Sequence, residues 1–137
     1  MFLKEESAYI TGLTNLASYY SKEIGPSYVE ADCFDKENFI DDFSKLYTIP
    51  KEDVQIEKTN LSLEEFLKMW FGESNKELIE GLLHWIRIHY GEDKKIYETC
   101  ENSKVLNYDI GMFFNLEDIY FVEFEKLVIG FYIGNDE

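Results

Sequence analysis

The chain has 137 residues, of which 45% are hydrophobic and 17% aromatic. This length predicts a single domain, residues 1–137, able to bury a core without disulfides or metal ions, and the apolar content excludes a disordered acidic chain. The 28 Asp and Glu residues against 13 Lys and Arg give a formal net charge of −15, which repels phosphate backbones and anionic lipids and therefore disfavours direct binding of nucleic acid or a membrane surface.

The first predicted element is an amphipathic helix. Apolar residues recur at helical spacing between Ser7 and Ile24, with Thr11 and Asn15 on the polar side. The Gly-Pro pair at residues 25–26 is expected to end this helix, since proline cannot donate the next hydrogen bond.

A second helix is predicted from Asp35 as N-cap to the residues before Pro50. Its outward side is acidic, and its buried side is expected to consist of Phe39, Ile40, Phe43, Leu46 and Tyr47. Residues 54–59 then alternate apolar and polar side chains, which favours a short strand, with a loop as the alternative.

A third helix is indicated by a capping-box pattern. Ser62 and Glu65 have the spacing of reciprocal caps, and the helix is expected to run through Phe71 to Gly72. Trp70, near the end of this helix, is expected to belong to the core but to lie nearer the surface than the second tryptophan of the chain.

A fourth helix is predicted over residues 75–90. Ser74 and Glu77 repeat the capping pattern at its start, and Gly91 closes it. Its broad apolar stripe predicts a position deep in the core, Trp85 included.

The C-terminal third is dense in β-branched and aromatic residues. Runs at 119–124 and 127–133 flank a Glu-Lys pair, which predicts a hairpin, while residues 105–115 allow a further strand or a short helix. Because both faces of each run are apolar, the sheet is expected to be central or covered on both sides. The whole pattern predicts an α+β fold with about four helices packed on a small, mainly antiparallel sheet that ends in a C-terminal β-hairpin.

The residue types that most often carry catalysis form no recognisable motif. His84 and His89 are five residues apart on a helix and point about 140° away from each other, so they cannot chelate one metal ion together. Cys33 and Cys100 lie among carboxylates, whose charge raises a thiol pKa. No catalytic residue, metal or cofactor is therefore predicted, and an enzyme with an unrecognised Cys/His or dicarboxylate site remains an alternative.

The sequence favours a cytoplasmic location. Two cysteines without a paired motif indicate a reducing compartment, and acidic residues follow the N-terminus before a signal-peptide-like apolar stretch can develop. The longest mainly apolar run, residues 127–133, is too short to span a bilayer.

The most informative polar segment extends from residue 30 to residue 42, where carboxylates oppose only Lys36. The candidate partner-binding residues are Glu30, Asp32, Asp35, Glu37, Asp41 and Asp42. Such a patch would attract Lys and Arg side chains lining the cleft of a basic protein and keep substrate phosphates out of it. A solvated loop and helix face is the alternative, and acidic pairs at 92–93, 117–118 and 136–137 are rival contact sites.

The segment Ile-Tyr-Phe-Val-Glu-Phe-Glu-Lys-Leu-Val-Ile-Gly-Phe-Tyr-Ile-Gly-Asn-Asp-Glu at residues 119–137 resembles the closing hairpin of bacterial immunity proteins of the polymorphic-toxin and contact-dependent growth inhibition type. The resemblance rests on apolar strands followed by an acidic end. It implies a small acidic cytoplasmic protein that binds a toxin domain and occludes its active site or substrate groove.

Charge and resemblance together predict an acidic binding protein that neutralises a basic partner. The first hypothesis is an immunity protein that blocks a bacterial nuclease toxin, with the cognate toxin domain as partner. The alternative binding protein is a phage- or plasmid-borne nucleic-acid mimic that inhibits a host enzyme, since both have the same electrostatics. The oligomeric state is left open.

Overall fold

The computed structural model of the chain describes residues 1–20, 27–72, 75–110 and 115–135. Six strands form one sheet in the order β1-β2-β6-β5-β4-β3, and every neighbouring pair is antiparallel. The strands are β1 (Phe2–Leu3), β2 (Ser27–Phe34), β3 (Ile56–Lys58), β4 (Asp93–Thr99), β5 (Asn115–Phe124) and β6 (Val128–Asn135). The helices are α1 (Lys4–Tyr20), α2 (Phe39–Tyr47), α3 (Leu63–Phe71) and α4 (Lys76–Tyr90), with 3-10 turns η1 (Lys51–Asp53) and η2 (Val105–Asn107).

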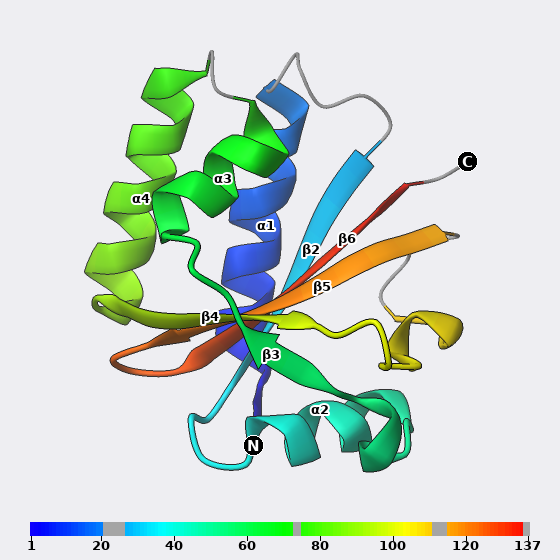
Figure 1. Cartoon of the computed structure of the whole chain (residues 1–137). Coiled ribbons are helices and arrows are strands. Elements are labelled where there is room, and N and C mark those ends of the chain that lie inside the picture. The colour runs from blue at the N-terminus through cyan, green and yellow to red at the C-terminus, as the bar shows by residue number, and fades with distance from the viewer. Residues whose placement is uncertain (21–26, 73–74, 111–114, 136–137) are drawn as a thin grey trace.

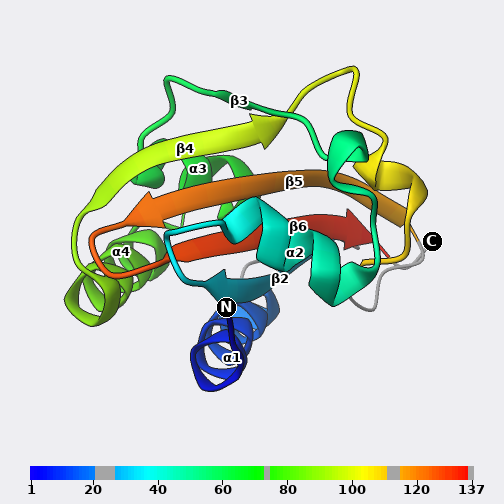
Figure 2. The same ribbon diagram turned by 90° about the horizontal axis from the view of Figure 1, so that it is seen from below.

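The sheet is covered on both faces (Figures 1 and 2). α1, α3 and α4 lie on one face, and α2 and η2 on the other. Successive side chains of a strand point to opposite faces, so Ile129 and Phe131 of β6 pack under the three helices while Val128 and Tyr132 pack under α2. The predicted α+β fold, with four helices among the described residues and a closing β5–β6 hairpin, is confirmed.

Two of the longer strands, β2 and β4, were not predicted, and β2 carries part of the charged segment. β2 pairs with β6 along its whole length, although Asp, Glu and Ala have low strand propensity. Its side chains facing α1, Val29, Ala31 and Cys33, are small and buried, which lets the helix pack closely. β4 was missed in the same way, and it is held between β5 and the short edge strand β3.

Helix boundaries were predicted unevenly. α1 begins at Lys4 instead of Ser7, and the expected stop at residues 25–26 lies outside the described residues. α2 begins at Phe39 after Asn38, which has a left-handed conformation with φ 59°. The prediction of Asp35 as its N-cap is therefore wrong, because Asn adopts this conformation more readily than most residues and the chain is still leaving β2 at position 35.

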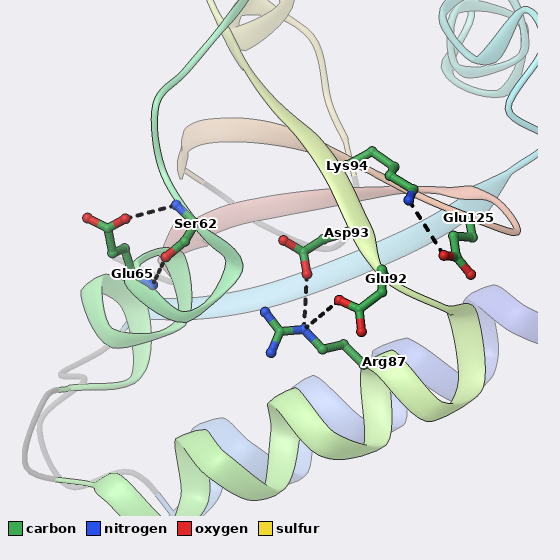
Figure 3. A network of polar contacts seen from close by, with 7 residues as sticks. All are labelled: Ser62, Glu65, Arg87, Glu92, Asp93, Lys94 and Glu125. Carbon is green, nitrogen blue, oxygen red and sulfur yellow. Dashed lines mark hydrogen bonds and ion pairs between the residues drawn. The ribbon is translucent and has the colours of Figure 1, made fainter.

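The capping box of α3 is confirmed (Figure 3). The backbone N–H of Glu65 donates to Ser62 Oγ at 3.1 Å, and the N–H of Ser62 donates to Glu65 Oε1 at 3.0 Å. These bonds satisfy two of the N–H groups that a helix start leaves without partners. The repeat of this pattern at Ser74 falls outside the described residues.

Ser7 joins the first helix to the sheet. Its Oγ accepts a hydrogen bond from the N–H of Cys33 and donates to the carbonyl of Leu3, each at 2.7 Å. The side chain thus bridges the N–H of Cys33 and the carbonyl of Leu3, which face each other in the ladder between β1 and β2, where the chain turns from strand into helix. This contact fixes α1 against β2.

Candidate functional site

The six carboxylates predicted to bind a partner fall on three consecutive stretches of chain near the N-terminus (Figure 2). Two lie on β2, two on its connection to α2 and two in the first turn of α2: Glu30 and Asp32, Asp35 and Glu37, and Asp41 and Asp42. The two strand residues point to the α2 side of the sheet, because Phe34 on the same strand face belongs to that core. The structure therefore does not make the six residues equivalent: Asp35, Glu37 and Asp42 line one depression, whereas Glu30 and Asp32 lie on the sheet.

Asp32 is largely engaged within the fold. It is half-buried, and its Oδ2 accepts a hydrogen bond from the hydroxyl of Tyr47 on α2. Burial raises the pKa of Asp32, and the hydrogen bond from Tyr47 opposes that rise. Burial and the Asp32 carboxylate both raise the pKa of the Tyr47 hydroxyl. Asp32 thus ties β2 to α2, and little of its charge is available to a partner.

The helix carboxylates are partly paired. The amino group of Met1 makes ion pairs with Asp42 and, at 3.5 Å, with Asp35. Asp41 Oδ1 is 2.7 Å from Nζ of Lys51. Glu37 is exposed and makes no ion pair with a described residue. The exposed part of the patch therefore centres on the connection from residue 35 to residue 37.

A shallow depression of about 400 Å³ lies in this region. It is lined by Met1, Asp35, Lys36, Glu37, Asn38, Asp42 and Lys126. Two lysines and an amino group are interspersed with three carboxylates, so the lining has mixed charge. Such a surface suits a protein partner with its own pattern of charges better than a small ion of one sign.

The histidines lie on the surface of α4 and serve different contacts. His89 Nε2 is 2.9 Å from Glu6 Oε2, and its ring stacks on Tyr9 with centroids 4.4 Å apart. His84 is exposed beside Trp85. His89 thus joins α4 to α1.

The thiol of Cys33 is unsuited to nucleophilic chemistry at neutral pH. It is completely buried, and burial raises its pKa to about 12, with further contributions from Glu6 and Asp32. The predicted direction is confirmed, although burial outweighs the carboxylates that the sequence indicated. Catalytic thiols are exposed and have a lowered pKa.

A second carboxylate cluster joins β4 and β5. Tyr120 donates to Glu98 Oε2 at 2.9 Å, and Thr99 Oγ1 donates to Asp118 Oδ1 at 3.2 Å. Burial and the neighbouring Glu98 raise the pKa of Asp118 to about 7. Sequence reasoning noted the acidic pair at 117–118 but not this cluster, because Glu98 and Tyr120 become neighbours only through the pairing of an unpredicted strand.

The rival acidic pair at 92–93 is partly neutralised (Figure 3). Nε of Arg87 is 3.0 Å from Asp93 Oδ1 and 3.9 Å from Glu92 Oε2. Nearby, Nζ of Lys94 is 3.5 Å from Glu125 Oε1. The pair at 136–137 lies outside the described residues.

The two tryptophans reverse their predicted order of exposure. Trp85 is 55% exposed on α4, so the expectation that it belongs to the core is wrong. The buried stripe of α4 is formed instead by residues such as Ile79, Leu82 and Ile86, and Trp85 lies just outside it. Trp70 is half-buried, and its ring packs against Tyr120 with centroids 6.2 Å apart.

The described residues contain no helix long and apolar enough to cross a bilayer. Within those same ranges, no three His, Cys, Asp or Glu side chains are placed to hold a metal ion together. No family model, curated protein or solved structure matches the chain.

Proposed function

We propose that this protein binds a basic protein and blocks it, and that its specific form is an immunity protein against a bacterial nuclease toxin. The observation that supports this most is the charge excess of a well-packed fold: −15 on a chain whose sheet is covered on both faces. On the surface of that fold, the exposed carboxylate of Glu37 makes no ion pair with any described residue. A cationic partner would supply the missing counter-charges.

The proposed contact surface is the acidic end, defined as Asp35, Glu37, Asp41 and Asp42. These residues lie within eight positions of one another on the β2–α2 connection and the first turn of α2. Glu30 and Asp32 are left out, because both lie on β2 and Asp32 accepts a hydrogen bond from Tyr47. Lysines of a partner could displace the amino group of Met1 and the side chain of Lys51 from these carboxylates at small cost, because exposed ion pairs contribute little stability.

The proposed mechanism is electrostatic. A nuclease must present Lys and Arg side chains to hold the phosphates of its substrate. An acidic protein is attracted to the same cleft over distances of about the Debye length, near 8–10 Å at physiological salt. Once docked, the acidic protein occupies the substrate groove of the nuclease. Its carboxylates then keep phosphate groups away from the Lys and Arg side chains that they bind.

The test measures affinity for the product of the neighbouring gene, which the proposal predicts to be a toxin domain. In the acidic-end variant, Asp35→Asn, Glu37→Gln and Asp41→Asn remove three charges. The matched control, Glu57→Gln, Glu80→Gln and Glu101→Gln, removes three exposed charges from β3, α4 and the turn after β4. The proposal predicts that the acidic-end variant binds at least tenfold more weakly than the control.

Two results would contradict the proposal. Equal weakening by the two variants would mean that overall charge matters and that the acidic end is not the contact. A parent protein that fails to protect cells from the neighbouring toxin but binds a host DNA-binding enzyme would contradict the immunity function and support nucleic-acid mimicry instead.

A further inference from the structure

An apolar groove runs between α1 and α4 on the outer side of the helical layer. The two helices are antiparallel neighbours, because His89 near the end of α4 contacts Glu6 and Tyr9 near the start of α1 (Figure 1). The groove encloses about 280 Å³, and its lining includes Leu13, Leu16, Leu78, Gly81, Trp85 and Glu77. It lies on the opposite face of the sheet from α2, so it is a different surface from the acidic end.

Large apolar side chains stand exposed around this groove. Leu16 is 56% exposed, Trp85 55% and Ile88 59%. Leu16 and Trp85 line the groove, and Ile88, which is not in the lining, lies three residues after Trp85 on the adjoining surface of α4. Single exposed apolar residues are ordinary, but a contiguous group that lines a groove is typical of a binding surface, and tryptophan is the residue most enriched at binding hot spots.

Gly81 keeps the groove open. It lies inside α4, where glycine is less favourable than alanine, and a Cβ added there would meet nothing within 4 Å. The packing of this chain therefore does not require glycine at this position. Gly12 of α1 also has no atom within 4 Å of an added Cβ, but it is not part of the groove lining.

The charged residue in the lining of the groove is acidic: Glu77, at one end. Beyond the other end, Glu6 is paired with His89, whose carbonyl accepts a hydrogen bond from Nζ of Lys126. The Lys and Arg side chains of these helices lie elsewhere. Because each residue of a helix is rotated by about 100° from the one before it, Lys4 and Lys76 point away from the groove. Arg87 is paired with Asp93. A second copy of the chain would bring like charges together at this surface, because each copy carries −15.

We propose that this groove binds an amphipathic helix of a partner protein, with apolar residues on one side and Lys or Arg at both ends. Glu77 and His89, the residue paired with Glu6, are twelve positions apart on α4, or about 18 Å along its axis. This distance sets the separation of the Lys or Arg residues at the two ends of the bound helix. The apolar face of such a helix would cover Leu16 and Trp85, with a side chain inserted over Gly81. This is recognition of a helix in a groove, in which anchors at helical spacing give the affinity.

The probe is a synthetic amphipathic helix of about 16 residues with leucines on one side and lysines at both ends. Binding to the full chain is measured by titration calorimetry, with a peptide in which glutamates replace the lysines as charge control. The proposal predicts one-to-one binding of the lysine peptide and at least tenfold weaker binding of the glutamate peptide. Trp85→Ala and Gly81→Leu should each weaken binding at least tenfold.

Gly12→Leu is the matched control, since it places the same side chain in open space on the neighbouring helix. Equal weakening by Gly12→Leu and Gly81→Leu, or no binding of the lysine peptide, would overturn the proposal. A concentration-dependent dimer in sedimentation that Gly81→Leu abolishes would also overturn it, because the occupant would then be a second copy. Circular dichroism of each variant confirms that a loss of binding reflects the groove and not unfolding.

Discussion

The hydroxyl of Thr11 on α1 donates a hydrogen bond to the carbonyl of Ala31 on β2, with 2.6 Å between the oxygens. One turn later, the Thr14 hydroxyl donates to the carbonyl of Val29 at 3.1 Å. β1 pairs only with the last two residues of β2 in the described chain, so these carbonyls lie on the edge beyond it. The helix thus covers an edge that could otherwise pair with another chain. The prediction that Thr11 lies on the polar side of the helix is wrong.

Thr11→Val and Thr14→Val test this edge. Valine keeps the branched shape but removes the donor, leaving a strand carbonyl without its partner. Each substitution should lower the free energy of unfolding by about 1–3 kcal/mol, measured by urea denaturation. Asn15→Ala, an exposed position on the same helix, should change it by less than about 0.5 kcal/mol. Valine variants as stable as the parent would show that the hydroxyl bonds contribute nothing.

Asp118 should make stability depend on pH. Its pKa is raised from 3.8 to about 7 by burial and by Glu98, so the folded state holds a proton that the unfolded chain releases. This contribution to stability is complete below about pH 4 and is lost as pH rises through about 7. Asp118→Asn, which stays neutral, should therefore remove part of the fall in Tm between about pH 5 and pH 8, by about 3 °C or more.

The control for this prediction is Asp109→Asn, which changes an exposed carboxylate. It should leave the slope of Tm against pH close to that of the parent. Parallel curves of Tm against pH for the parent and Asp118→Asn would contradict the proposal that Asp118 makes stability depend on pH.

Two glycine substitutions should change the free energy of unfolding in opposite directions. Gly91 ends α4 with φ +89°, and an added Cβ would lie 2.7 Å from Oε2 and 2.8 Å from Cβ of Glu125. Gly91→Ala should lower the free energy of unfolding by about 1–3 kcal/mol. Gly81→Ala should raise it by about 0.5–1 kcal/mol, because alanine is the better helix former and the space is open. Denaturation curves of the two variants check both signs, and a shared sign would show that local geometry does not decide the effect.

The two cysteines should differ in reactivity. Cys33 is buried with a pKa of about 12, whereas Cys100 is half-buried. A thiol reagent at neutral pH should therefore modify Cys100 at least tenfold faster in the folded protein, and Cys33 should react only after denaturation. Mass spectrometry after timed labelling measures both rates. Rapid labelling of native Cys33 would contradict its burial and revive a cysteine-based activity.

Elements with a strong local signal were predicted well. The capping box at Ser62 and Glu65 and the apolar runs of β5 and β6 could be recognised because the residues that define them are close in sequence. β2 was not recognised, since its acidic and small residues form a strand only through pairing with β6, about a hundred residues later. The patch of six carboxylates therefore seemed continuous in sequence, although Glu30 and Asp32 belong to the sheet.

Trp85 shows a second limit of prediction from the sequence. The periodicity of α4 is apolar over so wide an arc that a buried side could not be told from an exposed apolar edge. Only the positions of α1 and the sheet decide that Ile86 is buried while Trp85 stands beside the groove. The groove itself is formed by two helices more than fifty residues apart in the chain, and no local pattern reveals it.

The most direct test of the proposed function is the salt dependence of the association rate with the cognate toxin domain, measured by stopped flow from about 0.05 to 0.5 M salt. If surplus carboxylates steer the encounter, the parent rate should fall steeply with salt, while dissociation changes little. The variant Asp35→Asn, Glu37→Gln and Asp41→Asn should associate more slowly and with a shallower slope. An association rate that is independent of salt, or the same for parent and variant, would contradict docking through the acidic end.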